Sequence, residues 1–182
     1  MSPGAGGPAG RDHPSPVVLH PGDFFFGRAP GRVETLLGSC VAITLWHPAL
    51  HVGGMCHYLL PSRSRTGEEA GRLDGRYADE ALEMFRRSAS RLSTDLDEYV
   101  VKMFGGGRQF DCDPVAHRID VPARNVAAGR ALLRRAGLVP AAEHVGGVGP
   151  RTVRLNLHSG RVEVRHAGAD VPDLWMSEGV SA

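Results

Sequence analysis

Two short runs of apolar and β-branched residues, separated by a turn, form the clearest pattern in the chain. The first run covers residues 41–46 and the second covers residues 52–60, and both are rich in side chains that favour strands. The segment between them, residues 47–50, contains Pro48, which cannot donate to a β-ladder and therefore belongs in a turn. The pattern predicts a β-hairpin with at least one buried face.

The predicted register of this hairpin brings a cysteine and a histidine together. If Trp46 pairs with His51 across the four-residue turn, the same register sets Cys40 directly opposite His57. Directly opposite residues have Cβ atoms about 4.5–5.5 Å apart on one face of the sheet. A bulge at Gly53-Gly54 would shift the pairing by one residue and separate the two side chains. A regular hairpin therefore predicts a thiol–imidazole contact.

A second cysteine, Cys56, is adjacent to His57 in sequence. Successive side chains of a strand point to opposite faces, so Cys56 is a poor partner for His57. Only Cys40 can reach the histidine from the neighbouring strand.

The rest of the pattern predicts further strands and two helices, an α+β fold. Apolar residues at three- and four-residue intervals predict a helix over residues 77–92, and a similar pattern that ends before Gly137 predicts another over residues 124–136. The further strands are expected at residues 17–19, 23–27, 99–104 and 138–144, and in a second hairpin over 152–165 that turns at Ser159-Gly160.

Length and composition predict one ordinary domain. The 182 residues can bury one sizeable core, which we expect over residues 17–182, whereas residues 1–16 are rich in Gly, Pro and Ala and are expected to form a disordered tail. The sequence contains neither a signal-peptide pattern nor a stretch of roughly 18 apolar residues, so we expect a cytoplasmic protein without membrane insertion. The net charge of +1 gives no electrostatic case for nucleic-acid binding.

The cysteines and histidines indicate neither a disulfide framework nor a metal site. Three cysteines (Cys40, Cys56 and Cys112) are an odd number, and the cytoplasm would keep them reduced. Their spacing from the histidines matches no zinc pattern. We therefore expect no metal and no cofactor.

Two loops can be interpreted from their composition. Residues 62–76 form a long, locally basic polar loop, typical of a lid, a recognition segment or a mobile connection. Gly105-Gly106-Gly107 is not a phosphate-binding loop, because the Lys-Ser/Thr pair that should follow is absent. We interpret it as a sharp turn whose backbone approaches the active site.

Several stretches resemble one known family in the family's order. They read GSCVAITLWHP and GGMCHYLLP in the hairpin, then GRYADEALEMF, KMFGGGRQF and ARNV, between about Pro21 and Arg165. This sequence is similar to CheD, the chemoreceptor glutamine deamidases of bacterial and archaeal chemotaxis. The resemblance implies a layered α/β/β/α fold with mixed sheets, similar to the cysteine hydrolase domain of cytotoxic necrotizing toxins, and a shallow site at a sheet edge.

The resemblance also implies a substrate and partners. An enzyme of this family deamidates glutamines on the cytoplasmic domains of methyl-accepting chemotaxis proteins and can act on their methyl esters. The alternative is a non-catalytic module that binds and stimulates a CheC-type chemotaxis phosphatase. An intact cysteine and histidine favour the enzyme, because an adaptor does not need a thiol opposite an imidazole.

The residue types suit the implied chemistry. Cys40 would attack the carboxamide to form a thioester, with His57 as base toward the thiol and acid toward the departing ammonia. The turn at Gly38 and Ser39 would supply hydrogen-bond donors for the oxyanion. A threonine six positions before the cysteine commonly orients the histidine in this family. That position holds Glu34 here and Thr35 follows it, so both stay open as the orienting residue, with Thr35 preferred.

Overall fold

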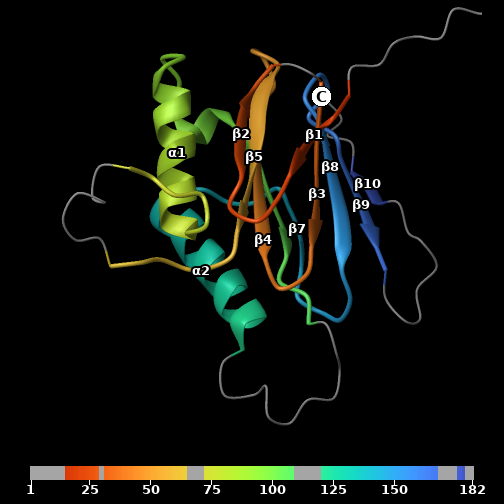
Figure 1. The fold of residues 1–182 in the computed structure, drawn as a ribbon. Helices are drawn as coiled ribbons and strands as arrows, with labels where there is room; N and C mark the ends of the chain where they lie inside the picture. The colour runs from red at the N-terminus through yellow and green to blue at the C-terminus, as the bar shows by residue number, and fades with distance from the viewer. Residues whose placement is uncertain (1–14, 29–30, 65–71, 109–119, 168–175, 179–182) are drawn as a thin grey trace, which may run out of the picture.

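The computed structural model describes residues 15–28, 31–64, 72–108 and 120–167, together with the backbone of 176–178. Ten strands form two mixed sheets, and two α-helices accompany them (Figure 1). The predicted α+β class is confirmed. Cys112 and almost all of the predicted tail, residues 1–14, lie outside the described residues.

The first sheet, here called the central sheet, is built around the predicted hairpin. Its strand order is β2-β5-β4-β6-β7, with a parallel pairing only between β6 and β7. The strands are β2 (Phe24–Gly27), β4 (Val41–His47), β5 (Val52–Tyr58), β6 (Val100–Gly105) and β7 (Ala142–Val145).

The second sheet, here called the outer sheet, packs face to face against the central sheet (Figure 1). Its order is β1-β3-β8-β9-β10, and β1 runs parallel to β3. The strands are β1 (Val17–Leu19), β3 (Arg32–Leu37), β8 (Arg151–Asn156), β9 (Val162–His166) and β10 (Met176–Glu178). The predicted second hairpin is confirmed in β8 and β9.

Both helices cover the same face of the central sheet. Helix α1 (Ala78–Ser90) packs on β2 and β5, and α2 (Val121–Arg135) packs on β4 and β6. A short 3-10 turn (Leu96–Glu98) precedes β6. The layers among the described residues are therefore α/β/β, and the predicted fourth, helical layer is wrong for this part of the chain. Helices α1 and α2 both bury their apolar faces on the central sheet, so neither of them covers the outer sheet.

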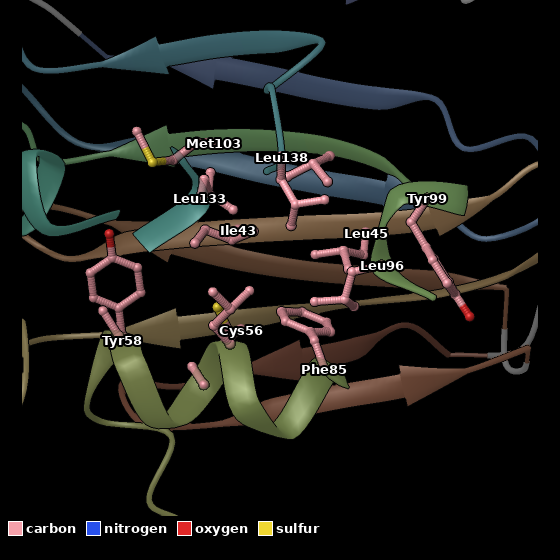
Figure 2. Close-up of a cluster of buried hydrophobic side chains, with 14 of the residues drawn as sticks. Ile43, Leu45, Cys56, Tyr58, Phe85, Leu96, Tyr99, Met103, Leu133 and Leu138 are labelled. Carbon is pink, nitrogen blue, oxygen red and sulfur yellow. The ribbon is translucent and has the colours of Figure 1, made fainter. Parts of the chain in front are cut away.

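Two apolar clusters divide the core between these layers. Figure 2 shows the helix-side cluster, where Cys56 and Tyr58 of β5 and Ile43 of β4 lie close to α1 and α2. The other, inter-sheet cluster lies between the two sheets and includes Leu37, Ala42 and Phe104. The alternation of strand side chains thus assigns Cys56 to the helix side of the central sheet, on the opposite face from His57 as the sequence predicted.

The second helix begins earlier than its apolar pattern indicated. The predicted range was 124–136, and the helix spans Val121–Arg135. The Asp120 side chain accepts a hydrogen bond from the Ala123 N–H, which caps the first turn, and Pro122 fits there because the first turn needs no N–H donor from it. In the described chain, neither helix is long and apolar enough to cross a membrane.

The register of the hairpin differs from the predicted one by two residues. Trp46 pairs with Gly53 rather than with His51, so Ala42 and not Cys40 lies directly opposite His57. The turn again has four residues, now 48–51, and it closes because His51 adopts a left-handed φ of 49°. The predicted direct pairing of Cys40 with His57 is therefore wrong. Because the register differs by two residues and strand side chains alternate with a period of two, Cys40 still lies on the same face of the sheet as His57.

Candidate active site

Cys40 lies in a tight turn between the two sheets. The turn, residues 38–40, connects β3 of the outer sheet to β4 of the central sheet. The Cys40 side chain is half-buried and packs against the inter-sheet cluster, on the same side of β4 as Ala42. The sulfur therefore lies at the edge of the space between the sheets and is partly accessible.

The three carbonyl groups of this turn are all held by hydrogen bonds. Gly107 N–H donates to the Gly38 carbonyl over 2.9 Å, and Gly106 N–H donates to the Cys40 carbonyl over 2.7 Å. The amide Nδ2 of Asn125 donates to the Ser39 carbonyl over 3.2 Å. Among the described residues no acceptor takes the N–H groups of the same three residues. The turn is fixed through its carbonyls and leaves its donors available.

The triple glycine, Gly105-Gly106-Gly107, allows the close approach that these hydrogen bonds need. We call the hydrogen bonds from Gly106 and Gly107 to the cysteine turn the glycine clamp. Gly105 has a φ of 111°, and a Cβ atom there would lie 2.3 Å from the carbonyl oxygen of Cys40. A side chain at this position would therefore be strained and would push the strand away from the cysteine. The interpretation of this segment as a sharp turn is confirmed, and its backbone approaches the turn that holds Cys40.

His57 is held from both its backbone and its ring. Its backbone pairs with the segment before β2, through Gly22 N–H to the His57 carbonyl at 2.7 Å and His57 N–H to the Asp23 carbonyl at 3.0 Å. Its side chain is 1% exposed, and its Nδ1 atom lies 2.8 Å from the hydroxyl of Thr35 on β3. The imidazole therefore reaches across from the central sheet to the outer sheet.

The Thr35 hydroxyl determines which ring nitrogen of His57 carries the proton. Thr35 Oγ1 donates its only hydrogen to the Leu19 carbonyl over 2.8 Å, so toward His57 it acts as an acceptor. Nδ1 must then be the protonated nitrogen, and Nε2 carries a lone pair. Nε2 is buried and has no hydrogen-bond partner among the described residues. The network thus leaves a bare basic nitrogen.

Glu34, the other candidate for orienting the histidine, points the opposite way. Side chains alternate along β3, so Thr35 faces the central sheet while Glu34 lies on the far face of the outer sheet. There its carboxylate pairs with Arg154 over 3.1 Å. The contact with His57 is made by Thr35 alone of the two.

Cys40 and His57 lie diagonally on the same side of the central sheet. Cys40 precedes Ala42, the residue opposite His57, by two positions, and diagonal neighbours in a regular ladder lie about 7–8 Å apart. The unpartnered Nε2 atom shows that the thiol is not hydrogen-bonded to it in this state. Contacts of this kind are often long without substrate and tighten when it binds.

Burial keeps both groups neutral. It raises the pKa of the Cys40 thiol above its ordinary value, and a hydrogen bond from the Ser39 side chain opposes this rise. It lowers the pKa of His57 to about 4, despite opposing effects of the Leu19 carbonyl and of Asp23. At neutral pH the site therefore holds a thiol and a neutral imidazole rather than a thiolate and an imidazolium.

Comparison with known proteins assigns the chain to a family. A family model described as CheD chemotactic sensory transduction matches residues 59–166. A probable chemoreceptor glutamine deamidase CheD of Pseudomonas fluorescens (strain SBW25) is 47% identical over 154 residues, which cover 82% of this chain and 84% of that protein. The chain belongs to the CheD family. Two further CheD proteins with the same description, from Dechloromonas aromatica (strain RCB) and Pseudomonas syringae pv. tomato (strain ATCC BAA-871 / DC3000), are 45% and 44% identical over 80% and 86% of this chain and 84% and 92% of their own.

The match to CheD proteins extends over the whole candidate site. The family model begins at residue 59, after His57, and covers the triple glycine and Asn125. A match over 86% of the chain cannot leave out residues 35–57, so the relatives also cover Thr35, Cys40 and His57. Similarity to CheD is therefore not confined to the second half of the chain.

Asn125 is a site residue that sequence reasoning did not single out. It is fully buried on α2, and its Nδ2 donates both to the Ser39 carbonyl and, over 2.7 Å, to the Leu59 carbonyl. The backbone carbonyl of Asn125 accepts a hydrogen bond from the Tyr58 hydroxyl over 2.8 Å. A polar residue on the buried face of an amphipathic helix was the available signal. In this CheD protein Asn125 connects the end of β5 to the cysteine turn.

Among the described residues, neither the second cysteine, Cys56, nor potential metal ligands enlarge the candidate site. Cys56 is buried on the helix side of the central sheet, and burial raises its pKa to about 12. Over the part of the chain that the structure describes, His, Cys, Asp and Glu side chains form no cluster of three or more that could hold a metal ion. The groups that the described residues bring to the candidate site are a thiol, an imidazole and backbone donors.

Proposed function

We propose that this protein deamidates glutamine residues of methyl-accepting chemoreceptors, converting them to glutamate with Cys40 as the nucleophile. The CheD relatives are described as probable chemoreceptor glutamine deamidases, and they cover most of the chain. The observation that carries the proposal is the His57 imidazole, whose Nδ1 is held by Thr35 and whose bare Nε2 lies on the same side of the sheet as Cys40. A base so oriented suits proton transfer from a nearby thiol.

The first half-reaction forms a thioester. As the glutamine carboxamide approaches, His57 Nε2 takes the Cys40 proton and the sulfur attacks the carbonyl carbon. The oxyanion that forms can be bound by the N–H groups of Gly38, Ser39 and Cys40, whose carbonyls are fixed on the other side of the turn. The imidazolium then protonates the amide nitrogen, which leaves as ammonia.

The second half-reaction restores the enzyme. His57, neutral again, takes a proton from water, and the hydroxide attacks the thioester carbonyl. The carbon–sulfur bond breaks, the sulfur recovers the proton, and the substrate leaves as glutamate. A methyl ester of glutamate presents the same carbonyl with methanol as the leaving group, so the same residues are suited to receptor methylesterase activity.

The surroundings of Cys40 also bear on the substrate and on the fold type. A half-buried sulfur at a sheet edge suits a glutamine on the surface of a folded protein in the cytoplasm. The similarity to the cysteine hydrolase fold of cytotoxic necrotizing toxins belongs to this proposal too, with the α/β/β layers of the described residues as its core.

The test is mass spectrometry of a chemoreceptor cytoplasmic domain after incubation with the protein. Glutamine-to-glutamate conversion is expected with wild type and is expected to fall by about 10³-fold or more in Cys40→Ala and His57→Ala. Cys56→Ala is the matched control, because it removes a buried thiol from the opposite side of the sheet and should leave turnover near wild type. Conversion that persists in Cys40→Ala would reject the nucleophile. No conversion of any receptor, together with binding to a CheC-type phosphatase, would favour a binding module.

A further inference from the structure

Arg151, the first residue of β8, is a fully buried cation beside the cysteine turn. Its side chain is 1% exposed. Nη1 donates to the His144 carbonyl over 2.7 Å and lies 3.0 Å from His144 Nδ1, and Nη2 donates to the Gly146 carbonyl. Nε is buried and has no partner among the described residues. All partners of the guanidinium are neutral groups of one short segment.

No carboxylate among the described residues compensates this charge. Arg151 forms no ion pair there, and the carboxylate next to its partner His144, that of Glu143, is paired with Arg130 at 2.6 Å. Burial lowers the pKa of Arg151, as expected for a cation removed from water. Burying an unpaired charge is expensive, so a cation in this position is expected to serve a purpose that a neutral side chain could not.

The guanidinium lies directly behind the clamp on the cysteine turn. Arg151 pairs with Leu37 in the outer sheet, the residue immediately before Gly38. Its Nη2 atom is 3.0 Å from where a Cβ atom on Gly107 would lie, and Gly107 N–H holds the Gly38 carbonyl. The charge therefore faces the backbone that positions the nucleophile.

We infer that Arg151 is a positioning residue for the reaction at Cys40, which fixes the segment behind the cysteine turn and supplies an unpaired positive charge that favours the thiolate and the oxyanion. Negative charge develops at Cys40 only during the reaction. When the sulfur loses its proton, the thiolate supplies the negative charge that compensates the Arg151 guanidinium. The catalytic part of this inference rests on the function proposed above, whereas the effect on the thiol can be measured without any substrate.

Among the described residues, few other titratable groups lie near Arg151 and Cys40. His144 on β7 faces Arg151 and makes an edge-to-face contact with His166 on β9, with ring centroids 5.3 Å apart. On the side of Cys40 the facing group is His57, whose own ionisation is affected by Asp23 and His20. Burial lowers the pKa values of His57 and His144, so both are neutral above about pH 7. Ionisation of Cys40 can therefore be followed in the alkaline range without their protonation.

The experiment measures alkylation of Cys40 by iodoacetamide between pH 6 and 11, with the Cys40 peptide quantified by mass spectrometry. Arg151→Gln keeps amide donors for the neighbouring carbonyls but removes the charge, and Arg151→Lys keeps the charge without the planar fork. Arg154→Gln removes a charge from the same strand but on its other face, where Arg154 pairs with Glu34, and is the matched control.

The expected result is a rise of about one pH unit in the Cys40 midpoint for Arg151→Gln, the general size of effect that a unit charge has over roughly 10 Å at an effective dielectric constant of about 20. Arg151→Lys and Arg154→Gln should stay within about 0.3 unit of wild type, since both keep the charge at residue 151. An unchanged midpoint in folded Arg151→Gln, or equal shifts in the Gln and Lys variants, would overturn the inference. Failure of both Arg151 variants to fold would make Arg151 a residue of folding alone and would overturn it too. If the Cys40 midpoint shifts as expected in Arg151→Gln but the wild-type protein deamidates no receptor, the result would count against the proposed function and not against the effect of Arg151 on the thiol.

Discussion

At the scale of single residues, one hydroxyl proton decides the chemistry of the site. Thr35 can donate to only one group, and it donates to the Leu19 carbonyl, so His57 must present Nδ1–H to it. Because the proton of the neutral ring is on Nδ1, Nε2 is unprotonated. This follows from the direction of the Thr35 hydrogen bonds and not from any contact that Nε2 makes. In the proposed reaction Thr35 would therefore act on the Cys40 sulfur through His57, as a positioning residue.

Replacing Thr35 by valine should test this argument, because valine keeps the shape and removes the hydroxyl. His57 can then rotate or change tautomer, and we expect the turnover number for deamidation to fall about 10–100-fold with a smaller change in KM. Two buried polar groups lose a partner, so the free energy of unfolding should drop by about 1–3 kcal/mol. Steady-state kinetics and urea unfolding measure the two effects separately.

The controls for Thr35 are a serine at the same position and a change at its neighbour. Thr35→Ser keeps the hydroxyl and should restore most of the turnover. Glu34→Gln affects the far face of the outer sheet and should leave turnover within about twofold of wild type, since the half-buried Glu34–Arg154 ion pair lies on the other side of the strand from His57. A larger loss in Glu34→Gln than in Thr35→Val would assign the orienting role to Glu34.

The sequence could indicate these residues but not choose between them. The cysteine, the histidine and the two candidates at 34 and 35 were all visible, because motif order and strand periodicity are local. The choice depends on which face of β3 meets the central sheet, and that is set by sheet packing between segments far apart in sequence. The same holds for Asn125, whose partners Ser39 and Leu59 lie more than sixty residues away.

At the scale of elements, the end of β6 and the cysteine turn form one unit. The backbone of Gly105 passes so close to the Cys40 carbonyl that only hydrogen fits as a side chain. Gly106 and Gly107 then donate to the carbonyls of Cys40 and Gly38. The position of Cys40 is thus set by the neighbouring strand β6 as much as by its own strand.

Gly105→Ala should disturb the nucleophile more than the fold. The added methyl group would meet the Cys40 carbonyl and displace it, and a displacement near 1 Å can cost about 10²-fold in rate. Gly147→Ala is the matched control, because Gly147 also has a positive φ of 72° but has nothing within 4 Å of the added Cβ. Both variants should lose about 1 kcal/mol of stability through the backbone, whereas only Gly105→Ala should lose most of its deamidase activity. Equal deamidase activities in the two variants would contradict the conclusion that the glycine backbone at the end of β6 positions Cys40.

Strands and helices with strong periodicity were predictable, and so were the two hairpins, whereas the register of the first hairpin and the pairings between distant strands were not. The two helices and most strands follow the expected ranges, whereas β3 was missed although Val33, Thr35 and Leu37 alternate with exposed or half-exposed residues. The charged residues in that alternation and the exposed Leu36 weaken the pattern. The hairpin register was misjudged by two residues because sequence does not reveal that His51 takes a left-handed turn conformation.

At the scale of the whole molecule, the site exists only when the two sheets are packed together. His57 comes from the central sheet and Thr35 from the outer sheet, and the cysteine turn joins them. At the far ends of the strands, Trp46 packs over Gly160 and its Nε1 donates to the Leu157 carbonyl over 2.9 Å. These contacts fix how the sheets pack together. The packing buries His57, which in water would be protonated at any pH below its usual pKa of 6.5.

That burial should make the protein less stable in mild acid. The pKa of His57 is about 4 in the folded state against 6.5 in the unfolded chain, so between these values the unfolded state binds more protons. Stability contributed by His57 is therefore present above about pH 6.5 and is lost as pH falls toward 4. The expected decrease in the free energy of unfolding from pH 7 to pH 5 is about 2 kcal/mol, measured by urea unfolding at the two pH values. The lowered pKa of His144 acts in the same direction, and Asp74, whose pKa is lowered by Arg76, matters only below this range.

His57→Gln isolates the part of this acid sensitivity that comes from the site. Glutamine cannot be protonated, so the decrease between pH 7 and pH 5 should become smaller by about 2 kcal/mol, leaving the contribution of His144 and other groups. An equally steep decrease in this variant would mean that the imidazole is solvated and free to ionise in the folded protein. A neutral, buried His57 would then be excluded, and with it a resting site in which the thiol and the imidazole are both uncharged.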